Sequence, residues 1–158
     1  MKLYAPSTIR GIKEKYGFKL SKSLGQNFLT DKNIIDKIID STEITDEDLV
    51  IEIGPGIGVL TYEAAQQAKK VIAVEIDKNL IPILKDTLAE FDNVEVINQD
   101  VLKTDLNQII ADSGCREAKI IGNLPYYITT PIIMGILESN TIADSITIMM
   151  QKEVADRW

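Results

Sequence analysis

The segment Asn123-Leu124-Pro125-Tyr126 combines an amide, a proline and an aromatic ring directly after a mostly apolar run, residues 119–122. An asparagine oxygen can accept a hydrogen bond from an exocyclic amine. A tyrosine ring can stack on a flat base, which is worth about 1–3 kcal/mol. Proline fixes φ and has no N–H, so it holds the segment in one conformation. The tetrapeptide therefore suits an amine-bearing ring, although Asn and Pro are also common in plain strand-to-loop turns.

A glycine-rich turn, Gly54-Pro55-Gly56-Ile57-Gly58, follows the apolar run 49–53 and precedes a helical pattern. Glycine permits positive φ and close approach of a ligand, and the positive end of the next helix points at the turn. The dinucleotide fingerprint G-x-G-x-x-G would need a third glycine where Val59 stands. Pro55 also removes one N–H that a pyrophosphate would use. Many strand–helix turns contain glycine, so the turn alone does not identify its ligand.

Acidic or amide residues stand at the carboxyl ends of four successive apolar runs, at Glu52, Glu75, Asp100 and Asn123. Ligands of open α/β sheets bind along that edge, and an acid about 20 residues past the glycine turn can bind both ribose hydroxyls. We therefore expect Glu75 to hold a ribose. Asp100 can accept from an adenine amine while the main-chain N–H of Val101 meets the ring. Together these residues predict a nucleoside-type cofactor site.

Two acids near this edge have simpler interpretations. Glu52 lies one residue inside its strand, so it can instead be buried and bonded to loop amides. Asp77 follows the second strand and is interpreted as a solvated acid.

Composition predicts one soluble, cytoplasmic domain, since 158 residues with 45% hydrophobic content can bury a core. No apolar stretch approaches the ~20 residues that cross a bilayer, and Met1-Lys2-Leu3-Tyr4 does not begin a secretory signal. Cys115 is the only cysteine, and there is no histidine. Histidine-dependent hydrolysis, Cys-His proteolysis and most zinc chemistry are thereby excluded. We expect a monomer without a metal site.

The charge is distributed unevenly. Residues 1–38 carry eight basic and three acidic side chains, a net +5, whereas residues 39–158 carry nine basic and 21 acidic ones, a net −12. A basic N-terminal arm on an otherwise acidic chain indicates that the arm binds a polyanion. The alternative is a solvated amphipathic arm.

The pattern of strands alternating with helices predicts a parallel sheet with right-handed crossovers. Strands are predicted at 49–53, 71–75, 94–98, 119–123 and 145–150, and helices at 58–68, 78–91, 105–112 and 129–139, after a helical arm. Residues 151–158 resemble the first turns of another helix, so we expect the catalytic domain to be C-terminally truncated. The predicted division is an arm over 1–30 and a partial catalytic domain over 31–158.

Five segments, spread over residues 21–154, together resemble the ribosomal RNA adenine dimethyltransferase family. They are Ser23 through Leu29, Glu52 through Gly58, Val74 through Asp77, Asn123 through Tyr126, and Gln151 through Val154. Pro55 and the Ser-Leu-Gly before Gln26 favour the bacterial small-subunit branch, the KsgA type. Related branches are the Erm enzymes, which modify large-subunit rRNA, and mitochondrial factors.

The resemblance implies a Rossmann-like class I methyltransferase fold, S-adenosyl-L-methionine as cofactor, and N6,N6-dimethylation of two adjacent adenosines near the 3′ end of 16S rRNA. The implied partner is the small ribosomal subunit. The implied catalytic residues are Asn123, Leu124, Pro125 and Tyr126. The implied cofactor contacts are Asn27, Leu29, Gly54, Gly56, Glu75, Ile76, Asp100, Val101 and Asn123. An Erm-like or DNA adenine methyltransferase and a non-catalytic ribosome-assembly or transcription factor remain alternatives.

Overall fold

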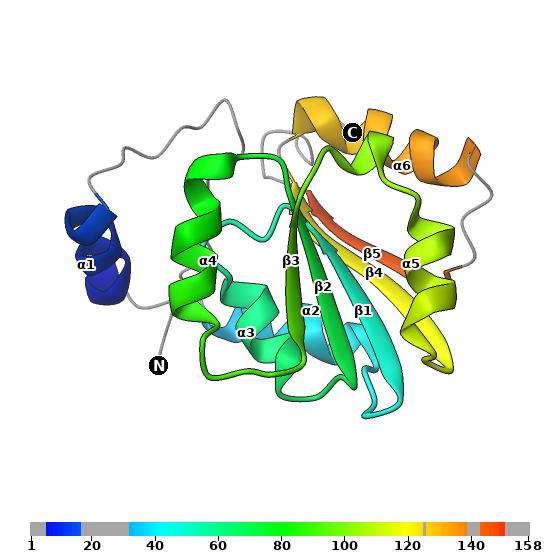
Figure 1. Cartoon of the computed structure of the whole chain (residues 1–158), viewed down its shortest axis with the longest axis horizontal. Helices are drawn as coiled ribbons and strands as arrows, with labels where there is room; N and C mark the ends of the chain where they lie inside the picture. Colours follow the sequence, from blue (N-terminus) through cyan, green and yellow to red (C-terminus); the bar gives the residue numbers. More distant parts are fainter. Residues whose placement is uncertain (1–5, 17–31, 125, 139–142, 151–158) are drawn as a thin grey trace.

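The computed structural model describes residues 6–16, 32–124, 126–138 and 143–150, and its centre is a five-stranded parallel sheet (Figure 1). The strand order is β3-β2-β1-β4-β5, and every neighbouring pair is parallel. The strands are β1 (Asp48–Ile53), β2 (Lys70–Glu75), β3 (Val94–Asn98), β4 (Glu117–Leu124) and β5 (Ser145–Met150). This sheet confirms the predicted Rossmann-like α/β class.

Helices cover both faces of the sheet, as a parallel sheet requires. Val50 of β1 packs with α2, α3 and α4, whereas Leu49 and Ile51 face the core shared with α5 and α6. Figure 1 shows α4 and α5 on opposite sides of the sheet. The helices are α1 (Pro6–Tyr16), α2 (Lys32–Thr42), α3 (Val59–Ala65), α4 (Ile81–Thr87), α5 (Leu106–Ser113) and α6 (Tyr126–Glu138), with 3₁₀ turns η2 (Lys78–Leu80) and η3 (Val101–Lys103).

Strand positions were more predictable than helix boundaries. β3 and β5 have the predicted bounds, but the helices predicted at 58–68 and 78–91 are shorter, and α2 was not separated from the arm. The 78–91 segment begins as the 3₁₀ turn η2, and the Asp77 side chain caps its start by accepting from the N–H of Asn79. α6 begins at Tyr126 rather than 129, so a single residue separates it from β4.

Part of the predicted N-terminal arm lies against α4. The Lys15 ammonium and the Tyr16 hydroxyl both donate to Asp86 Oδ2, at 2.5 and 2.6 Å. Ile12 and Tyr16 also pack against the core cluster beneath α3 and α4. The helix α1 is therefore anchored through its last two turns, and Figure 1 shows it beside α4. Closure of a cofactor site by residues 1–30 stays a prediction.

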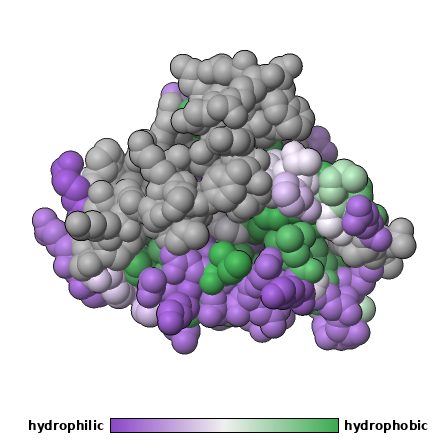
Figure 2. All heavy atoms as spheres, turned by 90° about the horizontal axis from the view of Figure 1, so that it is seen from above, coloured by the Kyte–Doolittle hydropathy of each residue, from purple (hydrophilic) through white to green (hydrophobic). Residues whose placement is uncertain are grey.

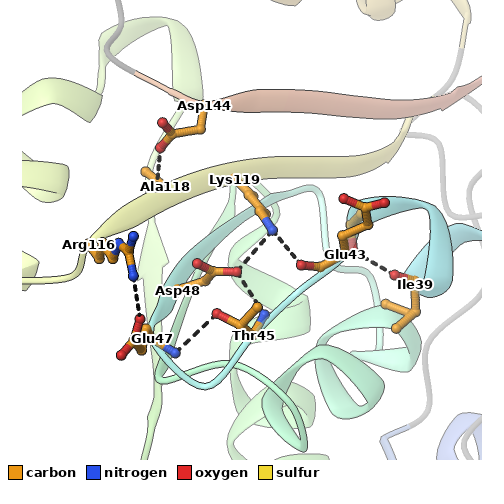
Figure 3. Close-up of polar contacts among 10 residues, drawn as sticks. Ile39, Glu43, Thr45, Glu47, Asp48, Arg116, Ala118, Lys119 and Asp144 are labelled. Carbon is orange, nitrogen blue, oxygen red and sulfur yellow. Dashed lines mark hydrogen bonds and ion pairs between the residues drawn. The ribbon is translucent and has the colours of Figure 1, made fainter.

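A buried ion pair joins β1 to β4 at the amino edge of the sheet (Figure 3). Lys119 Nζ lies 2.9 Å from Asp48 Oδ2 and also donates to the carbonyl of Glu43 at 2.6 Å. Burial would raise the pKa of Asp48, but the Thr45 N–H and the Lys119 ammonium hold it below its ordinary value. The carbonyl of Glu43 is presented by a backbone with φ of 52° just after α2. The pair thus fixes the end of α2 to two central strands.

A second buried polar pair lies nearer the carboxyl edge. Glu52 of β1 is 1% exposed, and its Oε1 accepts a 2.5 Å hydrogen bond from the Thr61 hydroxyl of α3. Burial raises the pKa of Glu52 to about 8, and the charge of Glu75 acts in the same direction. Glu52 is therefore buried, as one interpretation of the sequence held, but its partner is a helix hydroxyl. At neutral pH this arrangement favours a protonated carboxyl.

We predict that Lys119→Met destabilises the fold by about 3–5 kcal/mol, because it leaves the Asp48 carboxylate buried without its cation. The matched control is Arg116→Met, which removes the exposed ion pair to Glu47 and should cost about 0–1 kcal/mol. Urea unfolding of both variants measures the difference. Equal costs would show that the buried pair contributes no more than a surface pair.

We predict that the stability of Glu52→Gln, measured relative to the unchanged protein, increases as pH rises from 5 to 8. The folded protein holds a proton on Glu52 up to a pKa of about 8, whereas the ordinary value is 4.5. The unfolded chain binds fewer protons in this window, so stability falls with pH by up to about 1.4 kcal/mol per unit. Glutamine keeps the acceptor for Thr61 but cannot titrate. A stability difference that stays constant in urea unfolding at pH 5, 6, 7 and 8 would contradict the prediction.

Candidate functional site

The loops after four strands meet at one edge of the sheet. Ile53 of β1 is in register with Val74 of β2 and with Gly122 of β4, and Glu75 is in register with Asn98. The chain runs outward from β1 through β2 to β3, then returns to place β4 on the other side of β1. Such a reversal opens a crevice at the carboxyl ends of the strands, where ligands of these sheets bind. The carboxyl ends of these strands therefore share one edge of the sheet, as the predicted parallel arrangement required.

The glycine turn after β1 runs close to neighbouring elements. Gly54 has φ of 67°, its N–H donates to the carbonyl of Val74 at 3.0 Å, and a Cβ there would lie 3.2 Å from Leu124 Cδ2. Gly58 has φ of 96°, and a Cβ there would lie 3.2 Å from Thr87 Oγ1. A side chain at either position meets both an unfavourable φ and a close neighbour. The turn therefore keeps its backbone tight against β2, β4 and α4.

The Glu75 carboxylate joins this turn to the end of β2. It is 5% exposed, with Oε1 accepting from the Gly56 N–H at 3.2 Å and Oε2 accepting from the Asp77 N–H at 2.9 Å. Burial raises the pKa of Glu75, and these two N–H groups act in the opposite direction. The Ile76 N–H also lowers the pKa of Glu75, and a carboxylate has about four acceptor positions in all. Because the Gly56 N–H already donates to a carboxylate, it is engaged within the protein and not offered to a pyrophosphate.

Apolar and acidic groups flank Glu75. Ile76 is 62% exposed immediately after the buried carboxylate, and Val101 is nearly buried at the start of η3. Asp100, directly before Val101, is half-buried, and its Oδ1 accepts from the Leu102 N–H at 3.0 Å and caps η3. Thr104 holds the carbonyl of Asp100 through a 2.8 Å hydrogen bond. This combination of hydroxyl acceptors, exposed apolar surface and a fixed acid can accommodate a nucleoside.

The predicted catalytic residues stand at the end of β4 and the start of α6. Asn123 is half-buried and Leu124 is buried in the last two positions of β4. Tyr126 is the first residue of α6. Since β4 pairs directly with β1, this end lies beside the glycine turn. Pro125 and the predicted arm residues Asn27 and Leu29 lie outside the described residues.

The sequence did not single out two residues that hold the site together. Thr61 holds Glu52, and Asn98 donates from Nδ2 to the carbonyls of Glu75 and Ile76, at 2.8 and 3.3 Å. The only signal in the sequence was an asparagine at a strand end, which is also a common turn residue. Asp77 caps η2 rather than being simply solvated.

Surface and cluster features add little to this site. Figure 2 shows apolar patches among polar residues, and the exposed large apolar side chains include Ile76, Leu102, Met134 and Leu137. A small pocket between η3 and α6, bordered by Leu102 and Gly135, does not include Glu75 or Asn123. In the described ranges, no group of three His, Cys, Asp or Glu residues is placed to hold a metal ion. The helices described there are too short or too polar to cross a membrane.

Solved structures resemble this fold. A structure titled 23S rRNA methyltransferase ErmE is 34% identical with a TM-score of 0.66, over 82% of this chain and 50% of that one. A dimethyladenosine transferase from Plasmodium falciparum is 32% identical with a TM-score of 0.65, over 80% of this chain and 44% of that one. An RNA methyltransferase from Salinibacter ruber in complex with S-adenosyl-L-homocysteine, 18% identical with a TM-score of 0.59, covers 71% of each chain and shares the fold.

Curated relatives match nearly the whole chain. The ribosomal RNA small subunit methyltransferase A of Alkaliphilus metalliredigens is 60% identical over 99% of this chain, and that of Bacillus pumilus is 56% identical over 96%. The chain covers 55% and 53% of these two proteins, so it spans about half the length of the curated relatives it matches. The family model described as ribosomal RNA adenine dimethylase matches residues 17–158. The chain therefore belongs to the ribosomal RNA adenine dimethylase family.

Proposed function

We propose that this chain carries the cofactor site and the catalytic residues of an enzyme that dimethylates N6 of two adjacent adenosines near the 3′ end of 16S rRNA. The observation that carries the proposal is the buried Glu75 carboxylate, held between the glycine turn and the end of β2, with the Asn123 strand end on the other side of β1. Relatives named as small-subunit enzymes at 56–60% identity favour 16S rRNA over the 23S rRNA of the 34% identical structure. The proposed setting is the cytoplasm, with a monomer acting on the small subunit during its biogenesis.

The site fits S-adenosyl-L-methionine, because it offers a buried acceptor for hydroxyls beside exposed apolar surface and a capped acid. Glu75 would hold the ribose hydroxyls, while Ile76, Asp100 and Val101 would hold the adenine. Gly54 and Gly56 would lie along the amino-acid part together with Asn123, and Asn27 and Leu29 would close the site. When bound, the cofactor supplies an electrophilic methyl group on a sulfonium, which is already a good leaving group.

The residues of this chain have one main task, which is to make adenine N6 a usable nucleophile. Its lone pair is delocalised into the ring. Asn123 Oδ1 and the main-chain carbonyl of Leu124 can each accept an N6–H, which favours a pyramidal nitrogen with its lone pair directed outward. Pro125 keeps these acceptors in one arrangement, and Tyr126 stacks on the base. Positioning then supplies much of the rate, and no strong general base is required.

Dimethylation sets a further requirement. After the first transfer N6 keeps one hydrogen, so the site must accept a methyl group where a donor was. The target base must also leave its stack, which costs least in a single-stranded loop.

We predict that Glu75→Gln weakens S-adenosyl-L-methionine binding at least about tenfold, because charge-assisted hydrogen bonds to ribose hydroxyls are worth roughly 1.5–3 kcal/mol each. Glutamine preserves the size of the side chain and one acceptor for the neighbouring N–H groups. The matched control is Glu47→Gln, an exposed acid at the amino edge, which should bind as the unchanged chain does. Isothermal titration calorimetry measures the Kd of both variants. If the Glu75 variant binds as tightly as the unchanged chain, Glu75 does not hold the ribose.

We predict that the full-length protein transfers labelled methyl groups to small ribosomal subunits, and that Asn123→Ala reduces transfer far more than RNA binding. The hydrogen bond from N6 to Asn123 becomes stronger as N6 gains positive charge. Its removal therefore raises the free energy of the transition state more than that of the bound substrate. Tyr126→Ala should also slow transfer, whereas Tyr126→Phe should stay active because stacking needs the ring alone. An inactive phenylalanine variant would mean that the phenol takes part in hydrogen bonding or proton transfer.

The same assay separates the alternatives. Transfer to large subunits would indicate an Erm-like enzyme, and transfer to DNA would indicate a DNA adenine methyltransferase. RNA and cofactor binding without transfer to any substrate would indicate an assembly factor.

A further inference from the structure

We propose that Asn98 is a positioning residue of the nucleoside site, which fixes the turn that carries Glu75 and Ile76. The inference rests on the proposed function of that turn. Asn98 is the last residue of β3, in register with Glu75, the last residue of β2. Its side chain therefore stands where two neighbouring strands leave the sheet.

The contacts of Asn98 continue the sheet by one residue. The N–H of Gln99 donates to the carbonyl of Glu75 at 3.2 Å, and Asn98 Nδ2 donates to the same carbonyl at 2.8 Å. Asn98 Nδ2 also donates to the carbonyl of Ile76, at a distance of 3.3 Å and beyond the end of β2. A side-chain amide has two donors, so it can hold two successive carbonyls. The backbone carrying the carboxylate and the exposed isoleucine is thus held from the β3 side.

This anchoring matters because the groups proposed to contact the nucleoside lie on the turn after β2. The Glu75 carboxylate is fixed through Gly56 and Asp77, but Ile76 is 62% exposed. If the turn could move, a bound nucleoside would have to order it, and that entropy would be subtracted from its affinity. Asn98 removes this cost in advance. The effect should be confined to ligands that carry the ribose and the ring.

The chain contains a matched control for a purely structural role. Asn93, just before β3, donates from Nδ2 to the carbonyls of Ala65 and Ala68, at 2.9 and 3.1 Å. It therefore makes the same two kinds of hydrogen bond, to the end of α3 and the loop after it. It lies at the opposite end of the same strand. Asn93→Ala and Asn98→Ala remove the same number of contacts at different places.

The experiment measures the Kd of S-adenosyl-L-methionine and of adenosine by calorimetry, and the melting temperature, for the 158-residue chain and its variants. We expect Asn98→Ala to weaken both ligands by a similar factor, about three- to tenfold, from two lost hydrogen bonds. Asn98→Asp keeps the size but has no donor, so it should bind at least as weakly. Asn93→Ala should lower the melting temperature at least as much and leave both Kd values unchanged.

The outcomes separate this inference from the function on which it rests. If the unchanged chain binds neither ligand, the proposed cofactor site is wrong. If it binds both and the two Asn98 variants bind equally well, the positioning role is overturned. If Asn93→Ala weakened ligand binding as much as Asn98→Ala does, the loss of affinity would come from lower stability of the fold, and the positioning role would be overturned. A loss for S-adenosyl-L-methionine but not for adenosine would overturn the assignment to the nucleoside part.

Discussion

The site depends on one buried carboxylate. Glu75 accepts main-chain N–H groups from the turn after β1 and from the turn after its own strand, so it fixes two loops relative to each other. A buried acid without such partners would be costly, and here the backbone provides them. The glycine turn follows from this contact, since Gly56 must present its N–H to a side chain on the next strand. The elements around the site are arranged so that this carboxylate stays in place.

Two buried acids, one strand apart, have different roles. Glu52 is bonded to a helix hydroxyl and shares its surroundings with the charge of Glu75, which favours its neutral form. Burial raises the pKa of Glu75 as well, but main-chain donors on both of its oxygens oppose that rise. Glu52 links the sheet to α3, whereas Glu75 links the turns that follow β1 and β2. Their difference arises from partners, because both side chains are almost fully buried.

The sequence predicted the sheet and the edge of the site because strands and glycine turns leave local signals. β3 and β5 were placed at their observed bounds, and Glu75, Asp100 and Asn123 lie at strand ends as expected. Helix ends were less predictable: the segment predicted as one helix over 78–91 starts at Lys78 as expected, but it divides into η2 and α4 and ends at Thr87. The roles of Thr61 and Asn98 could not be predicted, since their hydrogen-bond partners lie on other elements. The arm residues Asn27 and Leu29 remain predictions.

The position of β4 beside β1 has a consequence for how the site is assembled during folding. β1, β2 and β3 follow one another in the chain and in the sheet, so the part of the site around Glu75 forms through contacts between near neighbours in sequence. Asn123 reaches the edge only when Asp48 pairs with Glu117, which closes a long loop. Closing long loops costs entropy and slows folding. The two halves of the site therefore differ in contact order, and the half that would hold the target base depends on the pairing between more distant segments of the chain.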